Sequence, residues 1–156
     1  MAITGRQRVG LEADGHFQSK FVTFATDKNV GLFFALDKTD SNIGVLADNT
    51  LTDQPAVGFI EKGSVERFGE AFSDEPNRPL YAGEGQKVYL TGILEVGAGT
   101  FTHEQVAKRI PIYEGTAGGW TVTKPTTGKR ARILGFPKDT ASIYVDFRID
   151  PIGVIV

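Results

Sequence analysis

The side chains that most often carry out acid–base or metal chemistry are scarce in this chain. It contains two histidines, His16 and His103, and no cysteine, which excludes a three-histidine zinc site and any thiolate ligand or nucleophile. His103 and Glu104 begin like the HExxH motif of zinc metalloproteases, but Ala107 occupies the position of the second histidine. These residues therefore predict no metal centre.

The sequence also lacks the usual motifs for phosphate binding and for nucleophilic catalysis. A phosphate loop requires GxxxxGK followed by Ser or Thr, because backbone amides hold the phosphates and the hydroxyl holds magnesium. The Gly128-Lys129 pair has Thr123 in place of the first glycine and Arg130 in place of the hydroxyl residue. No GxSxG motif, which would frame a nucleophilic serine, is present.

Paired carboxylates are the remaining candidates for chemistry, since two of them can hydrolyse a glycosidic bond. Glu66 with Glu70, or Asp146 with Asp150, have suitable types, but a chain with 19 acidic residues produces such pairs by chance. We therefore predict that the protein is not an enzyme and that it uses no cofactor.

Length and charge narrow the classes of partner. The 156 residues suit one domain with a real core, and the formal net charge of -2 supplies no overall basic field for nucleic acid. The sequence has no apolar run long enough to span a membrane and no apolar core of a secretory signal near residue 1. We expect no nucleic-acid partner and no membrane partner, and synthesis and use in a cytoplasm.

Short strands must position whatever site the chain has. The 19 glycines and 7 prolines are scattered at short intervals and leave little room for helices. Residues 27–29 suggest a hairpin connection, Gly92 suggests a bulge, and Thr102 with Gln105 forms a capping box that opens at most two helical turns through Arg109. The runs that predict strands are 20–26, 30–36, 43–47, 56–61, 64–68, 87–96, 109–114, 119–123, 131–136, 142–149 and 152–156.

This pattern predicts a mainly β fold. We expect a compact β-barrel or β-sandwich of about ten short strands with at most one short helix. Residues 20–156 form the single β-rich domain, and residues 1–19, which are polar and rich in glycine, form an extended N-terminal arm.

Uneven charge and aromatic residues suggest where such a domain makes contacts. Residues 115–138 hold five basic side chains and no acidic one, whereas 61–75 is mainly acidic, so complementary patches could guide association. The adjacent Phe33 and Phe34 should face opposite sides of their strand, which predicts an outward phenylalanine at a subunit contact. Trp120 follows a Gly-Gly turn and could present a stacking platform for a sugar.

Two segments resemble a known family. In residues 48–63 (DNTLTDQPAVGFIEKG), a polar turn rich in Asp and Thr leads into Ala-Val-Gly and an apolar pair. This segment is similar to one in the lambda-type head decoration proteins of tailed phages. Residues 110–144, with Pro-Ile-Tyr, a Gly-Gly turn, Lys-Pro-Thr and Leu-Gly-Phe, resemble the closing β unit of many small capsid-associated and head-fibre proteins.

The resemblance implies a capsid decoration, or cement, protein with a β-tulip-like fold. Such a protein binds the outer surface of a phage head, commonly as a homotrimer at local threefold positions, and locks neighbouring capsomers together. Its partner is then the major capsid protein, and its location is the outer surface of the virion after synthesis in the host bacterial cytoplasm. The residues we expect at capsid or subunit contacts are Arg6, Arg8, His16, Phe34, Trp120, Lys129 and Arg130.

Two other interpretations of the sequence remain open. The chain could serve as another structural subunit of the virion, in the tail or in a head fibre. It could instead be a carbohydrate-binding β module, with Trp120 as its platform.

Overall fold

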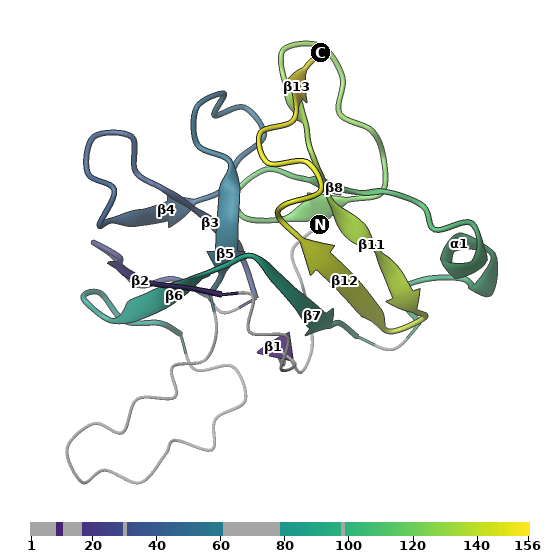
Figure 1. Cartoon of the computed structure of the whole chain (residues 1–156), viewed down its shortest axis with the longest axis horizontal. Helices are drawn as coiled ribbons and strands as arrows, with labels where there is room; N and C mark the ends of the chain where they lie inside the picture. The colour runs from purple at the N-terminus through teal and green to yellow at the C-terminus, as the bar shows by residue number, and fades with distance from the viewer. Residues whose placement is uncertain (1–8, 11–16, 30, 61–78, 98) are drawn as a thin grey trace, which may run out of the picture.

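The computed structural model describes residues 9–10, 17–29, 31–60, 79–97 and 99–156, and these form a mainly β fold with one short helix (Figure 1). The prediction of a mainly β protein is confirmed. The elements are β1 (Val9–Gly10), β2 (Phe17–Thr23), β3 (Phe33–Leu36), β4 (Gly44–Leu46), β5 (Ala56–Phe59), β6 (Gly85–Tyr89), β7 (Thr91–Glu95), α1 (His103–Ala107), β8 (Ile112–Glu114), β9 (Trp120–Thr121), β10 (Arg130–Ala131), β11 (Ile133–Asp139), β12 (Ser142–Asp146) and β13 (Val154–Ile155).

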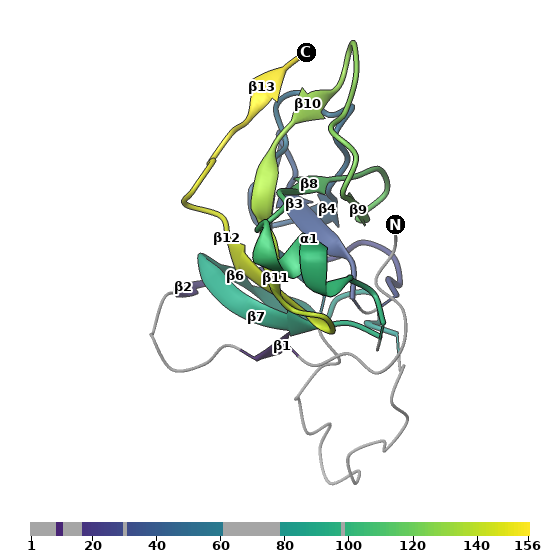
Figure 2. The same ribbon diagram turned by 90° about the vertical axis from the view of Figure 1, so that its right-hand side faces the viewer.

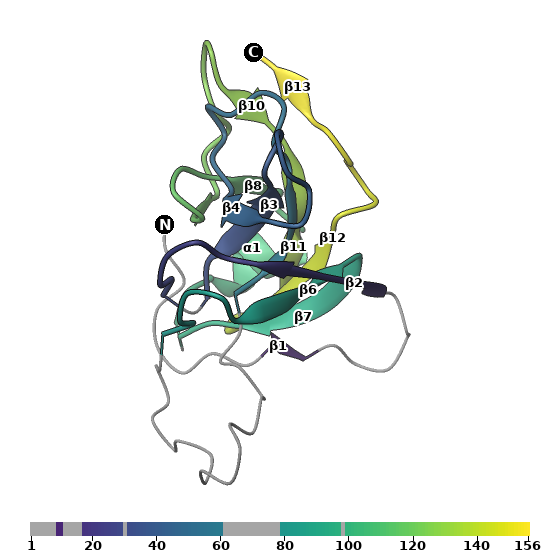
Figure 3. The same cartoon turned by 90° about the vertical axis from the view of Figure 1, so that its left-hand side faces the viewer.

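The strands of the described residues form four sheets. The largest has six strands in the order β1-β7-β12-β11-β8-β9, and the others are β4-β3-β5, β2-β6 and β10-β13. None of these sheets closes into a barrel within the described ranges, and their arrangement is consistent with the sandwich-like alternative of the sequence prediction. The β10-β13 ribbon lies at one end of the molecule, at the top of Figures 2 and 3.

Two hydrophobic clusters lie on opposite sides of β3. Phe33 belongs to the larger cluster, where its ring centroid is 4.8 Å from that of Phe59. Phe34 belongs to the smaller cluster and meets Phe24 edge to face, with centroids 5.4 Å apart. Both Phe33 and Phe34 are fully buried. The two side chains do face opposite sides, but both sides are core, so the prediction of an outward phenylalanine at Phe34 is wrong.

The short helix is formed as its capping box predicts. Thr102 accepts a hydrogen bond from the Gln105 backbone N–H at 3.1 Å, and the Gln105 side chain accepts one from the Thr102 backbone N–H at 2.9 Å. The reciprocal pair satisfies two N–H groups that have no partner inside the helix. The helix ends at the C-cap Lys108.

The pairing of strands differs from the sequence prediction in two places. β2 pairs with β6, and β3 pairs with β4 and β5, so residues 27–29 do not connect a hairpin. The run 87–96 is divided between β6 and β7, which belong to different sheets. Gly92 pairs regularly with Val145 and marks no bulge.

The described parts of the predicted N-terminal arm belong to sheets. β1 pairs with β7, and Phe17 at the start of β2 pairs with Tyr89 of β6. The rest of the predicted arm, residues 1–8 and 11–16, lies outside the described residues, as does the strand predicted at 64–68.

Candidate functional site

An exposed apolar segment runs from residue 149 to residue 156. Five of its side chains are apolar and exposed: Ile149 (52%), Ile152 (65%), Val154 (67%), Ile155 (46%) and Val156 (40%). The residues that form β13 are exposed on both faces of the strand. A water-exposed row of this length is unusual, and such rows mark surfaces that bind a partner.

The segment also presents backbone groups. β13 pairs antiparallel with β10, with Arg130 opposite Ile155 and Ala131 opposite Val154. Beyond β13, the Val156 N–H donates to the Lys129 carbonyl at 3.0 Å. β10 is the only strand that pairs with β13 in the described part of the chain, so no described strand occupies the other edge of β13.

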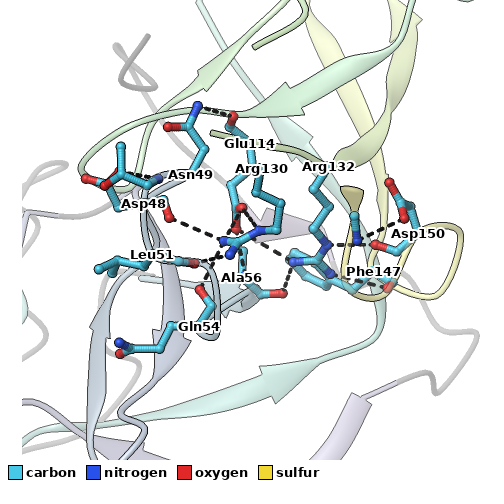
Figure 4. A network of polar contacts seen from close by, with 12 residues as sticks. Asp48, Asn49, Leu51, Gln54, Ala56, Glu114, Arg130, Arg132, Phe147 and Asp150 are labelled. Carbon is cyan, nitrogen blue, oxygen red and sulfur yellow. Dashed lines mark hydrogen bonds and ion pairs between the residues drawn. The ribbon is translucent and has the colours of Figure 1, made fainter. Parts of the chain in front are cut away.

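Hydrogen bonds hold the segment in place where it leaves the core. The Asp150 carboxylate accepts from the backbone N–H of Ile133 at 3.0 Å and of Gly153 at 3.1 Å. The Arg132 side chain donates to the Asp150 carbonyl at 2.7 Å and also reaches the Phe147 carbonyl (Figure 4). The apolar segment is therefore fixed to the sheet at its base, and its binding would cost little ordering entropy.

Arg132 belongs to a buried ionic network centred on Glu114. The Glu114 carboxylate accepts from Arg130 Nε at 2.8 Å and lies 3.7 Å from Arg132 Nη1. The side chains of Glu114 and Arg130 are fully buried. Burial lowers the pKa of Arg132 to about 10 against the opposing effect of the Glu114 carboxylate. The Arg132 guanidinium therefore remains charged at neutral pH.

The same network ties down the loop between β4 and β5. Arg130 donates to the backbone carbonyls of Leu51 and of Gln54, the latter at 3.1 Å. Glu114 Oε1 accepts from the Ala56 N–H at 2.7 Å (Figure 4). Each buried charge has both an ionic partner and backbone partners, so this network positions loops around the β10-β13 ribbon.

Gly153 allows the segment to approach Arg132 closely. Its φ is +78°, and a Cβ at this position would lie 2.6 Å from Arg132 Cβ. We expect Gly153→Ala to weaken the docking of residues 149–156 by about 1–2 kcal/mol from the left-handed backbone alone, and by more from the clash. Hydrogen exchange at the Val156 amide, which is bonded to Lys129, should become faster.

Gly99→Ala is the matched control for this variant. Gly99 has the same φ of +78°, but a Cβ added there would have no atom within 4 Å. It carries the conformational cost without the clash, so exchange at Val156 should stay as in the unmodified protein. Equal exchange rates in the Gly153 and Gly99 variants would contradict the close packing of Gly153 on Arg132.

The structure separates the residues predicted at contacts. Arg6, Arg8 and His16 lie outside the described residues. Trp120 is 2% exposed and stacks near Phe101 with ring centroids 5.5 Å apart, so it is a core residue and the prediction of a sugar platform there is wrong.

Two of the predicted basic contacts, Lys129 and Arg130, differ in their exposure to solvent. Arg130 is fully buried against Glu114, so its prediction as a surface contact is wrong. Lys129 is partly exposed and lines a hollow of about 300 Å³, together with Lys124, Asn49 and four threonines. Because Arg130 and Arg132 are both buried, the predicted basic patch of residues 115–138 retains only its lysines at the surface.

The exposed apolar row is not distinguished from a core strand by its sequence pattern. The run PIGVIV at residues 151–156 is as apolar as a core strand, but in the described part of the chain no element covers its apolar side chains. The carboxylates considered for catalysis are engaged differently. Asp146 binds Arg148 at 3.0 Å and Asp150 binds backbone amides, whereas Glu66 and Glu70 lie outside the described ranges.

Metal ligands and membrane spans are not found among the described residues. No three His, Asp or Glu side chains there are grouped as metal ligands, and no helix there is long and apolar enough to cross a membrane. Comparison with protein-family models, with curated proteins and with solved structures finds no match to this chain.

Proposed function

We propose that this chain is a capsid decoration protein of a tailed phage. It binds the outer surface of the head as a homotrimer and stabilises the contacts between neighbouring capsomers. The observation that carries the proposal is the exposed apolar row of residues 149–156, which is held rigidly at its base by Asp150 and Arg132. A pre-ordered apolar strand suits a fixed contact between proteins, because little entropy is lost on docking.

The proposed partner of this row is the major capsid protein. A decoration protein needs no catalytic residues, since its work consists of many equal contacts on a symmetric shell. Individually modest contacts then add to a large total affinity when each trimer is held at several points. The protein would be made in the host bacterial cytoplasm and would remain on the outside of the virion.

Binding to heads that lack this protein tests the proposal directly. Purified chain is mixed with such heads and co-sedimented, and the copies bound per capsomer are counted. We expect saturation at one trimer for each local threefold position. Absence of binding at micromolar protein would contradict the decoration role.

The apolar row can be tested with a paired substitution, Ile152→Ser with Val154→Ser. Both side chains are more than half exposed, so the fold should keep its melting temperature. Loss of two buried apolar side chains at a contact costs about 3 kcal/mol or more, so affinity for heads should fall about a hundredfold. Co-sedimentation across a range of protein concentrations measures this change.

Phe21→Ser is the matched control for the apolar row. Phe21 is 59% exposed but lies in β2, in a different sheet from the β10-β13 ribbon. Its substitution removes a comparable apolar side chain without touching residues 149–156, and head binding should be unchanged. If Phe21→Ser weakened binding while the double variant did not, the contact would lie elsewhere.

A further inference from the structure

The six-stranded sheet has a row of apolar side chains, two of them aromatic, on the face that points away from the hydrophobic core. Ile143 and Val145 of β12 are fully buried on the core face, so Tyr144 between them faces the other way. Tyr144 pairs with Phe136 of β11 on one side and with Ile93 of β7 on the other. The three side chains therefore form a row across adjacent strands.

The two rings of this row make a shallow platform. The centroids of Phe136 and Tyr144 are 5.4 Å apart, and the ring planes are tilted by 32°. Both residues are partly exposed, and neither belongs to the two core clusters. Side-by-side rings at this small tilt offer a ligand a broad apolar surface, and the Tyr144 hydroxyl adds a polar group at its edge.

A cation lies over one end of the platform. The guanidinium carbon of Arg109 is 5.8 Å from the centroid of the Phe136 ring. Unlike Arg130 and Arg132, whose guanidinium groups are buried against Glu114, the Arg109 side chain is exposed and makes no hydrogen bond or ion pair with any described residue. Among the described residues, nothing occupies its N–H donors, which can bind a ligand that rests on the rings.

The backbone of Arg109 is in a conformation that favours glycine. Its φ is +48°, and it follows the C-cap Lys108 of α1. The Arg109 N–H bonds the Val106 carbonyl at 3.0 Å and the Ile110 N–H bonds the Gln105 carbonyl at 3.3 Å, which is the Schellman arrangement that glycine usually completes. Arginine here costs about 1–2 kcal/mol relative to a residue that tolerates this φ. Because arginine is present here despite this unfavourable backbone energy, the Arg109 side chain itself is indicated to have a function.

We propose that Arg109, Phe136 and Tyr144 form a binding site for an acidic sugar, a pyranose ring that carries a carboxylate. The apolar face of the sugar stacks on the two rings, and Arg109 binds the carboxylate through two parallel N–H···O bonds. Glu95 of β7 lies on the same face of the sheet, two strands away from Phe136 in β11. Its negative charge repels the carboxylate of the ligand and so favours the orientation in which that carboxylate meets Arg109. With a net charge of -2 and a single arginine at the platform, the chain offers little to a nucleic-acid backbone.

Titration with two matched sugars tests this site on the isolated chain, so its outcome is independent of binding to phage heads. The probes are tetragalacturonate and its fully methyl-esterified form, which is neutral and has the same α-1,4-linked rings, and binding is followed by amide chemical shifts. We expect the acidic probe to bind about tenfold more tightly and to shift the amides of Phe136 and Tyr144. The preference should decrease as salt is added, because the charges meet at the surface.

Arg109→Gly separates binding from folding. This variant should melt at the same temperature or higher, since glycine suits the backbone, while the preference for the acidic probe is lost. Lys124→Gln removes an exposed positive charge elsewhere and should leave the preference intact. Phe136→Ala should weaken the binding of both probes.

Three results would overturn the proposal. They are the absence of shifts with the acidic probe, an unchanged preference in Arg109→Gly, and shifts confined to residues away from the platform. Shifts at Phe136 and Tyr144 caused by a single-stranded oligonucleotide, with none caused by the acidic sugar, would assign the platform to nucleic acid and would also overturn the proposal.

Discussion

Replacement of Glu114 by glutamine should destabilise the protein by about 3–5 kcal/mol, because it leaves two buried guanidinium groups without their carboxylate. For a chain of this size that corresponds to a melting temperature lower by about 10 °C. Urea unfolding followed by far-UV circular dichroism measures the free energy of unfolding of both proteins.

The geometry explains why an amide cannot substitute here. Glu114 Oε1 accepts from the Ala56 N–H, and this bond can survive with the glutamine oxygen. Oε2 accepts from both Nε and Nη2 of Arg130. In the glutamine variant an NH₂ group faces these donors, so Arg130 and the amide are both left with unpaired N–H groups in a buried site.

Glu95→Gln is the matched control for the buried carboxylate. Glu95 is exposed in β7, and its substitution should change the free energy of unfolding by no more than about 0.5 kcal/mol. An equally small effect for Glu114→Gln would mean that Arg130 and Arg132 find other partners or water, and the central role of Glu114 would be wrong.

The local elements were predictable because their signals are local. The capping box at Thr102 and Gln105 specifies the start of α1 within four residues of sequence, and the structure confirms it. The mainly β class follows from short apolar runs divided by glycine and proline. Such signals depend on neighbours in sequence, so the fold class could be predicted without knowing which strands pair.

Strand pairing was not predictable for the opposite reason. The three residues between the runs 20–26 and 30–36 have the composition of a hairpin turn, yet Phe34 packs against Phe24 in the core while β3 pairs with β4 and β5. Burial of apolar side chains on both faces of β3 outweighs the preference of a short turn. A sequence pattern does not report that a strand is covered on both sides.

The buried ionic network could not be predicted from the sequence, for a related reason. Arginines are usually exposed, so Arg130 and Arg132 contributed to an expected basic surface. Their partner Glu114 lies sixteen residues before Arg130, on another strand, and no periodicity links them. The exposure of residues 149–156 was hidden as well, because an apolar strand at an open edge has the same sequence pattern as one in the core.

The buried ionic network around Glu114 is directly connected to the exposed apolar row. Arg130 lies in β10 beside β13, and Arg132 binds the carbonyl of Phe147, just before the exposed row, and that of Asp150, near the start of the row. The buried charges thus determine where the row projects from the sheet. If the row contacts a capsid, Glu114→Gln should weaken that contact even at temperatures where most of the protein remains folded.

Gly135→Ala should destabilise the protein by about 3 kcal/mol or more, because a Cβ at this position would lie 1.8 Å from the Tyr144 carbonyl oxygen. Gly135 is buried in β11, opposite Val145 of β12 and Ile112 of β8. A flexible side chain could move aside, but a backbone carbonyl within a ladder cannot move without separating β11 from β12. We expect a melting temperature lower by about 6–12 °C in circular dichroism.

Gly85→Ala provides the comparison that isolates this clash. Gly85 also lies in a strand, β6, but the nearest atoms to its Cβ position are 3.5 Å away, in ordinary contact. Alanine there should be neutral or slightly stabilising, since it reduces the freedom of the unfolded chain. If Gly135→Ala had the same melting temperature as Gly85→Ala, β11 and β12 would not pair in this register. That result would also displace the Phe136–Tyr144 platform, because both rings depend on that pairing.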